Sequence, residues 1–312
     1  MSSSLQAIKN RNEKWVDHPA IPSWVDIDGV GLDQFFTKPE VADWCYGKYL
    51  NTLVADGAKL DNFTFVEPSV GDGAFYDLLP PKMRVGIDID PKRPEFTEAD
   101  FLSWMPAETR KPIATIGNPP FGYRAWLALA FMNHAAKFSE YVGFILPMAF
   151  QSDGKGSPKF RVKGMTLIST EFLPEGSFID PDGKTLKINA LWQVWKKGKN
   201  VQPEAKKCDD WIDLFTVDQR KERLCGHERM DDADFFLQRT YYNTPPNLVT
   251  DFAEVRYVCG YGIVFKKERE KVETILRSTN WDKYSNLAAH NCRHISMYHI
   301  RRALTDRGLI DD

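Results

Sequence analysis

The stretch FTFVEPSVGDGAF, residues 63–75, decides the class of fold. It begins as a short β-type run, passes through an acid, Glu67, and enters a turn in which Gly71 and Gly73 flank Asp72. A strand that ends in a glycine turn lets the backbone approach a ligand at the carboxyl end of a parallel sheet, where α/β folds bind cofactors. The segment therefore predicts an α/β fold with a ligand site after this strand. An ordinary strand-to-helix turn with the same residues remains the alternative.

The ligand suggested by this turn is not a pyrophosphate, because neither G-x-G-x-x-G nor G-x-x-x-x-G-K-S/T is present. An acidic turn suits a cationic or zwitterionic ligand better. Asp88, in VGIDIDP, follows Glu67 by about 20 residues, the spacing at which an acid on the next strand accepts hydrogen bonds from ribose hydroxyls. In EADFL, Asp100 would accept from an adenine amine and Phe101 would stack on the ring, although a loop acid beside a core phenylalanine is the plain alternative. Together these residues favour a nucleoside ligand.

The surrounding sequence alternates strand and helix in the manner of βαβ units, which predicts a parallel sheet. Four β-type runs lie at residues 63–69, 84–90, 112–118 and 141–147. A helix is expected from Pro39 to Gly57, and a second over 124–138, where the apolar residues on nearly every side predict packing on the sheet. Two later runs, 166–174 and 185–197, are joined by the turn residues of 180–183 and predict an antiparallel pair that closes the sheet.

Composition limits the protein's class. A chain of 312 residues with 43% hydrophobic and 27% charged residues is ordinary globular material, with room for one large domain and an appendage. The formal charge of -2 excludes a global attraction to nucleic acid, so any such contact must be a local patch. The five scattered cysteines favour reduced thiols, and no signal peptide or membrane span is recognised. We therefore expect a cytoplasmic protein with no membrane contact and no metal.

The chain divides by its patterns into three parts. Residues 1–34 are polar and aperiodic and predict an N-terminal arm, residues 35–197 carry the strand and helix patterns, and residues 198–312 form a C-terminal region of weaker periodicity. Between residues 265 and 307, Lys and Arg outnumber Asp and Glu. Such an excess is often a solvated helix face, but beside a nucleic-acid-modifying site it favours phosphate contact. The residues proposed for it are Lys266, Lys267, Arg301 and Arg302.

The most specific motif is Asn118-Pro119-Pro120-Phe121, at the end of a β-type run. Two successive prolines fix the backbone and remove two donors, so the Asn118 side chain and the neighbouring carbonyls form a rigid set of acceptors. The Asn118 side-chain oxygen and the Pro119 carbonyl would accept the two hydrogens of an exocyclic amine, and Phe121 would stack on the ring that carries it. The motif predicts recognition of a planar amine.

These residues resemble those of S-adenosylmethionine-dependent amino-methyltransferases with a D/N/S-P-P-Y/F tetrapeptide, specifically the N6-adenine DNA methyltransferases. The resemblance covers roughly residues 35–197. It implies an α/β, Rossmann-like class I methyltransferase fold, in which a seven-stranded, mostly parallel sheet has helices on both faces and a small C-terminal region follows. The glycine turn precedes the tetrapeptide, and too few residues separate them for a recognition domain. This is similar to the γ order of motifs, with target recognition in the C-terminal region.

The resemblance also implies the roles of individual residues. It implies S-adenosylmethionine contacts from Thr37, Glu67, Pro68, Gly71, Asp72, Gly73, Asp88, Asp100 and Phe101. In FFTKPEVAD, Lys38 interrupts the usual Thr-Pro spacing of the segment that covers the methionine end of the cofactor. The four residues of the tetrapeptide would be catalytic, and Phe178 is similar in position to an aromatic residue that packs on the flipped base.

The implied activity is site-specific methylation of adenine N6 in DNA, in duplex or single strands, with base flipping. Bacterial or phage-encoded restriction-modification is one setting for it. N6-adenine methylation of RNA and methylation of a glutamine amide remain alternatives, because N-P-P-F/Y occurs in those families too. A cofactor-binding regulatory protein without turnover is the third possibility. The roughly 115-residue tail after the sheet favours a long polymer substrate over an amide side chain.

Overall fold

The computed structural model describes residues 36–108, 111–122, 125–154, 157–180, 182–202, 204–255 and 258–311. The predicted arm, residues 1–34, lies outside this part of the chain. Two compact units are distinguished. The described part of the first spans residues 36–151 and 157–201, and that of the second spans 152–154 and 202–311.

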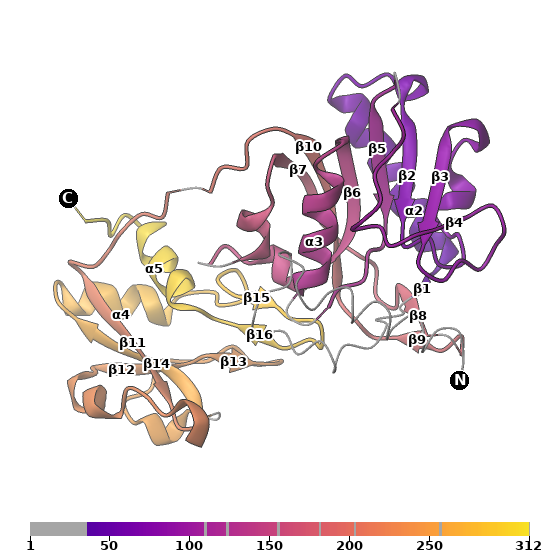
Figure 1. Cartoon of the computed structure of the whole chain (residues 1–312). Coiled ribbons are helices and arrows are strands. Elements are labelled where there is room, and N and C mark those ends of the chain that lie inside the picture. The colour runs from indigo at the N-terminus through magenta and orange to yellow at the C-terminus, as the bar shows by residue number, and fades with distance from the viewer. Residues whose placement is uncertain are drawn as a thin grey trace. The chain divides into compact units, whose positions relative to one another are not determined.

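The first unit is built on a seven-stranded sheet with the order β4-β3-β2-β5-β6-β10-β7 (Figure 1). Its strands are β2 (Thr64–Pro68), β3 (Arg84–Asp88), β4 (Thr97–Glu98), β5 (Ile113–Gly117), β6 (Ser139–Pro147), β7 (Met165–Phe172) and β10 (Ala190–Lys197). The first five in spatial order are parallel, and β10 runs antiparallel to both of its neighbours. This arrangement confirms the predicted class I methyltransferase fold.

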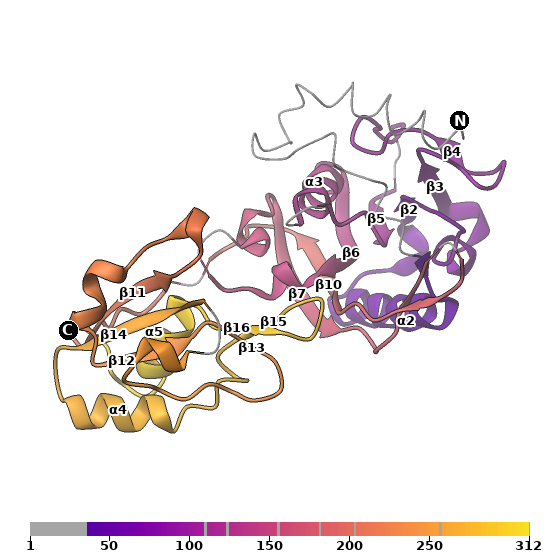
Figure 2. The same ribbon diagram turned by 90° about the horizontal axis from the view of Figure 1, so that it is seen from below.

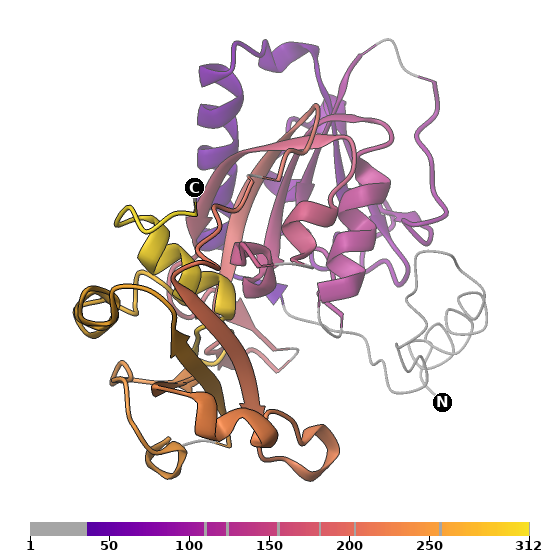
Figure 3. The ribbon, with the colours of Figure 1, turned by 90° about the vertical axis from the view of Figure 1, so that its left-hand side faces the viewer.

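Helices α2 (Pro39–Ala55) and α3 (Trp126–Ala135) cover opposite faces of the sheet, as Figures 2 and 3 show. The first begins at the predicted proline and buries one stripe of side chains against the sheet, among them Tyr49, whose ring meets that of Trp192 edge to face at 6.2 Å. The hydroxyl of Tyr49 donates to the Thr115 carbonyl on β5 at 3.1 Å. Because nearly every side chain of α3 is buried, its all-round apolar sequence is explained.

The C-terminal strand prediction was correct for the sheet but wrong for its connection. The runs that form β7 and β10 do pair antiparallel. The predicted strand over 185–197, however, is two strands, and the turn at 180–183 joins β8 (Phe178–Ile179) to β9 (Thr185–Leu186). These two strands form a separate small sheet with β1 (Phe36–Thr37). The residue pattern of a segment predicts an extended backbone but does not identify the strand with which the segment pairs.

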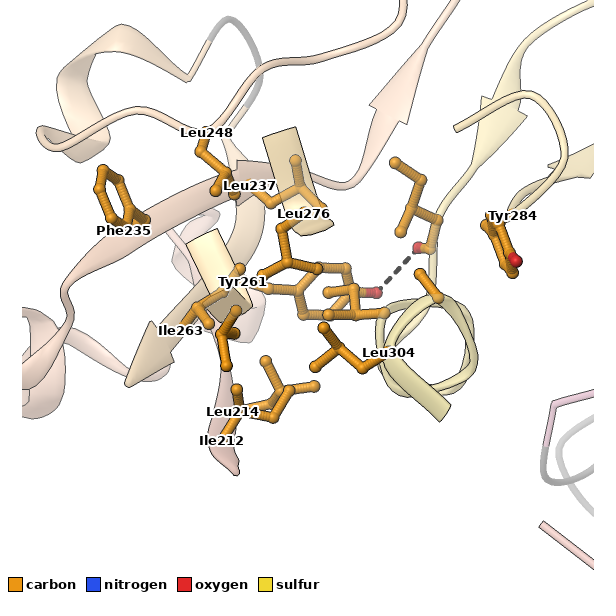
Figure 4. Close-up of a cluster of buried hydrophobic side chains, with 14 of the residues drawn as sticks. Ile212, Leu214, Phe235, Leu237, Leu248, Tyr261, Ile263, Leu276, Tyr284 and Leu304 are labelled. Atoms are coloured by element: carbon orange, nitrogen blue, oxygen red, sulfur yellow. Dashed lines mark hydrogen bonds between the residues drawn. The ribbon is translucent and has the colours of Figure 1, made fainter. Parts of the chain in front are cut away.

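In its described residues, the second unit has two three-stranded sheets and two α-helices. One sheet joins β11 (Ile212–Asp218), β14 (Cys259–Phe265) and β12 (Phe235–Gln238), and the other joins β13 (Thr240–Tyr241), β16 (Arg293–His294) and β15 (Asn286–Leu287). Helices α4 (Arg269–Arg277) and α5 (Met297–Thr305) are strongly amphipathic. Their apolar faces enclose Tyr261 with the first sheet (Figure 4), and the Tyr261 hydroxyl donates to the Ile295 carbonyl at 3.0 Å.

Candidate active site

A cleft opens at the carboxyl ends of β2, β3 and β5, where parallel α/β sheets bind ligands. Its volume, open mouth included, is about 1020 Å³. The cleft brings together residues that are far apart in the sequence. Of the residues singled out above, it is lined by Thr37, Glu67, Gly71, Asp72, Asp88, Asp100, Phe101, Asn118 and Pro120.

The glycine turn is held by the acid of the next strand. The Gly71 amide donates to Asp88 Oδ2 at 2.8 Å, and the Asp90 amide donates to Oδ1 at 3.0 Å. Gly71 has φ of 56°, a left-handed conformation that glycine adopts without steric cost. Burial raises the pKa of Asp88, and the two amide donors oppose that rise. Each oxygen keeps a further acceptor position, because a carboxylate oxygen has two lone pairs.

Glu67 places a buried carboxylate in the cleft. Its side chain is only 2% exposed, and among the described residues its Oε2 has no hydrogen-bond partner. Burial raises its pKa well above the usual value, the Tyr76 backbone amide lowers it, and nearby Asp72 and Asp88 raise it further. A buried carboxylate without a counter-charge is unfavourable, so this acid suits a ligand that supplies a cation.

The tetrapeptide lies beside these acids. Asn118 and Pro120 line the cleft, whereas Pro119 is buried. The Ser69 hydroxyl lies 3.2 Å from the Asn118 carbonyl oxygen and 2.5 Å from that of Pro68, and its one hydrogen can be donated to either, so it lies between the ends of β2 and β5. Ser69 has φ of 55°, a strained conformation for a residue with a side chain. Such strain is found at sites where the surrounding structure imposes it.

The two aromatic residues proposed for the target base contact each other. The rings of Phe121 and Phe178 meet edge to face with centroids 6.3 Å apart. Phe178 is completely buried in the core, opposite Thr37 in the small sheet, whereas Phe121 is half-buried. Phe121 therefore has the more accessible ring, and Phe178 lies behind it.

Asp100 and Phe101 form another wall of the cleft. The Leu102 amide donates to Asp100 Oδ1 at 3.0 Å, so the acid also shapes its own turn. Phe101 is 3% exposed and packs against Phe131, with ring centroids 5.1 Å apart, and against Trp104. Its ring is thus held by the core while the residue also lines the cleft.

Sequence reasoning missed several residues of the site. Arg93 donates to both carboxylate oxygens of Asp77 at 2.8 Å and also to the Asp72 carbonyl, so it clamps the glycine turn from outside. Gly73 has φ of 94°, in the left-handed region that favours glycine, which explains the second glycine of the turn. Ser69, inside the quoted motif, could have been found from its position between the acid and the glycine.

The four basic residues proposed for phosphate contact have partners in the second unit. Lys267 pairs with Asp210 at 3.2 Å and Arg301 with Asp209 at 3.2 Å. Arg302 bridges Asp153 and Asp306, and Lys266 donates to the Asp209 carbonyl. The local excess of positive charge is therefore partly neutralised.

Two other kinds of site are absent from the part of the chain that the structure describes. No three His, Cys, Asp or Glu side chains in this part of the chain gather as a metal site would require. No helix there is both long enough and apolar enough to cross a membrane.

Comparisons with known proteins give similarity at the level of structure. No model of a protein family matches the sequence, and a search of curated proteins finds no match. Among solved structures, the chain is similar to N-methyltransferase NodS from Bradyrhizobium japonicum WM9 in complex with S-adenosyl-L-homocysteine, with 13% identity over 64% of this chain and 100% of that one and a TM-score of 0.35. It is similar to magnesium protoporphyrin IX methyltransferase from Synechocystis PCC 6803 with bound S-adenosylmethionine, with 14% identity, coverage of 64% and 100%, and a TM-score of 0.36.

A third similar structure is a modification subunit assigned to a type I restriction enzyme from Vibrio vulnificus YJ016. The identity is 13%, the match covers 74% of this chain and 57% of that one, and the TM-score is 0.37. Similarities of this size assign neither a substrate nor a cofactor to the chain.

Proposed function

We propose that this protein transfers a methyl group from S-adenosylmethionine to the exocyclic N6 amine of adenine in DNA. The observation that carries the proposal is the shared cleft. Glu67, Asp88 and Asn118, which come from the ends of three different strands, line one cavity. A cofactor held by the two acids would thus lie beside the residue that grips the amine.

The residues present fit the proposed cofactor. The buried Glu67 carboxylate, with Oε2 unpartnered among the described residues, matches the ammonium of the methionine part. The remaining acceptor positions of Asp88 match two ribose hydroxyls. Asp100 and the edge of Phe101 would receive the adenine, and Thr37 would cover the methionine end. When bound, the cofactor supplies an electrophilic methyl group on a sulfonium centre.

The tetrapeptide prepares the attacking amine. The lone pair of adenine N6 is delocalised into the ring, which makes it a weak nucleophile. The Asn118 side-chain oxygen and the Pro119 carbonyl would accept its two hydrogens, localise the lone pair and aim it at the methyl group. Positioning would supply most of the rate, because the rigid prolines hold both acceptors in place.

The target base would enter the cleft from a flipped position. A base within a duplex is stacked, and removing it costs a few kcal/mol, which contacts in the pocket must offset. Phe121 would provide the stacking surface, with Phe178 supporting it from the core. Residues 35–197 would then be the catalytic domain and residues 198–312 the recognition region.

A panel of substrates tests the proposal. The purified protein is incubated with S-adenosylmethionine and, separately, with unmethylated duplex DNA, single-stranded DNA and ribosomal RNA, and the methylated nucleosides are quantified. N6-methyl-2′-deoxyadenosine from DNA supports the proposal. Product only in RNA moves the activity to the RNA alternative, and no product on any polymer leaves the glutamine amide or the regulatory protein.

The variant Asn118→Ala separates chemistry from cofactor binding. It removes one acceptor for the amine, so methyl transfer should fall at least about 100-fold, as when a single oriented hydrogen-bonding group is lost at other active sites. Cofactor affinity should change little. Asn51→Ala, which alters an exposed residue of α2, is the matched control and should leave both quantities unchanged.

A further inference from the structure

The first unit carries a basic surface that the cleft does not use. Two short segments, SPKFRVKG at 157–164 and WKKGKN at 195–200, each contain three Lys or Arg and no Asp or Glu. The whole protein has a net charge of -2, so the positive charge of these segments is local. The four cations at issue are Arg161, Lys163, Lys197 and Lys199, all of them exposed.

Specific hydrogen bonds bring the two segments together. The Gly198 amide donates to the Gly164 carbonyl at 3.0 Å, and Asn200 Nδ2 donates to the carbonyls of Lys159 and Val162 at 2.8 and 2.9 Å. The Thr166 hydroxyl donates to the Lys199 carbonyl at 2.9 Å. These contacts fix both segments at the ends of β7 and β10, so the cations form one surface.

A third element supports the same surface. Asn133, near the end of α3, accepts from the Lys163 amide at 2.8 Å and donates to the Arg161 carbonyl at 3.3 Å. Side chains alternate along β10, so Lys197 lies on the same face of the sheet as Gln193 and Lys196 lies on the opposite face. The Gln193 side chain donates to the Phe150 carbonyl. Lys196 pairs instead with Asp56, at the end of α2 on the other face.

The charges of this surface are not neutralised locally. Within the described chain, no ion pair joins Arg161, Lys163, Lys197 or Lys199 to an acid, in contrast to Lys267, Arg301 and Arg302 of the second unit. Like charges that are held together without counter-ions repel one another, and a bound anion removes that cost. Four exposed cations on two joined segments fit a partner that carries a chain of negative charges.

The surface is distant from the cleft. In the register of β10 with β6, Ala190 lies opposite Pro147, at the carboxyl end where the cleft opens, whereas Lys196 lies opposite Tyr141. At about 3.3 Å per residue, the basic surface is about 20–25 Å from that edge. It therefore does not contact the target base.

We propose that Arg161, Lys163, Lys197 and Lys199 bind the phosphate backbone of duplex DNA at a distance from the methylated base. The identity of the polyanion rests on the proposed function. Phosphates along a duplex repeat at one charge per about 1.7 Å of helix axis, so a polymer that occupies the cleft offers further phosphates to this surface. Contacts of this kind orient the duplex without reading its sequence.

The test replaces the four cations with glutamine and measures binding to a 30-base-pair duplex by fluorescence anisotropy across a series of salt concentrations. The slope of log K against log salt is negative, and each lost phosphate contact makes it less steep by about 0.9, so its magnitude should fall by about 3 to 4. The control replaces four other exposed lysines with glutamine, which removes the same net charge: Lys59, Lys82, Lys221 and Lys283. For this control variant, the magnitude of the slope should fall by less than about 1. Equal effects of the two sets, or wild-type protein that binds no duplex, would overturn the proposal.

Turnover separates this inference from the proposed function. The quadruple variant should raise the KM for DNA at least about tenfold, in line with the lost phosphate contacts, and leave kcat at saturating DNA and cofactor affinity unchanged. If wild-type protein binds duplex DNA through this surface but methylates nothing, the proposed function fails and the surface stands. If it methylates DNA and the variant retains its KM, the surface fails alone.

Discussion

The Asp88 carboxylate accepts a hydrogen bond from the Gly71 amide at 2.8 Å, so the end of β3 fixes the turn that follows β2. The acid thus has two roles: it shapes the cleft before any ligand binds, and it retains acceptor positions for one. Burial raises the pKa of Asp88, so a ligand that donates hydrogen bonds to this carboxylate would stabilise its charged form.

Replacing Asp88 with Asn should weaken binding of S-adenosylmethionine by about 10- to 100-fold. The substitution keeps the size of the side chain, removes its charge and leaves one acceptor oxygen, and hydrogen bonds to a charged acceptor contribute about 1.5–3 kcal/mol. Titration calorimetry measures the affinity. Asp61→Asn, at an exposed turn, should bind as wild type, and an Asp88→Asn variant that did the same would exclude Asp88 from the cofactor site.

Glu67 should make the stability of the ligand-free protein depend on pH. Its pKa is raised in the folded state, so below the ordinary value of 4.5 the group is neutral in both states. As the pH rises above 4.5, the unfolded chain releases the proton while the folded one retains it, and stability falls until the folded pKa is passed.

The variant Glu67→Gln lacks this titration. Its melting temperature relative to wild type should therefore increase as the pH rises above about 4.5, measured by thermal melts without cofactor across pH 4 to 8. The same variant should bind S-adenosylmethionine at least about tenfold more weakly, since the charge that meets the ammonium is gone. A constant difference in melting temperature across this range would contradict the assignment of a buried acid with a raised pKa.

Ser69 should respond differently to alanine and to glycine. Both substitutions remove the hydroxyl that can donate to the Asn118 carbonyl, so both should lower turnover. Glycine also relieves the left-handed backbone, so the Ser69→Gly protein should be more stable than Ser69→Ala by about 1 kcal/mol. Urea denaturation gives the difference. If the alanine variant were as stable as the glycine variant, the backbone would not be strained at this position.

The second unit should be destabilised by Tyr261→Phe. This hydroxyl, whose pKa burial raises to about 12, donates to the Ile295 carbonyl inside the core shown in Figure 4. Its loss leaves a buried carbonyl without that donor and should cost about 1–3 kcal/mol of unfolding free energy. Tyr242→Phe, at a residue 52% exposed, is the control and should change stability by less than about 0.5 kcal/mol. Cofactor affinity should be unaffected by either.

The first unit could be predicted from the sequence because its strands carry their own signals. The runs that became β2, β3, β5 and β6 are short, apolar and followed by turn residues. The acids Glu67 and Asp88 end two neighbouring parallel strands, and the carboxyl ends of such strands meet at one edge. Proximity in the cleft therefore followed from topology, without knowledge of any side-chain contact.

The residues that could not be predicted depend on contacts between distant segments. Arg93 reaches Asp77 and the Asp72 carbonyl across a loop, and nothing in its neighbours along the sequence indicates this. Likewise, Arg301 and Lys267 contribute to a local excess of positive charge in the sequence. In the structure, each forms an ion pair with an acid about 60 or more residues away. Local composition does not report which charges remain unpaired.

If one cleft binds S-adenosylmethionine and methylates adenine N6 in DNA, a labelled methyl group should pass from the cofactor to that nitrogen. The most direct test supplies S-adenosylmethionine with a deuterated methyl group together with unmethylated duplex DNA, digests the DNA and analyses the nucleosides by mass spectrometry. Wild-type protein should give N6-methyl-2′-deoxyadenosine that carries the deuterated methyl group, and Asn118→Ala should not. Label in N4-methylcytosine, or none in DNA while the protein labels RNA or a glutamine amide, would contradict the proposed function.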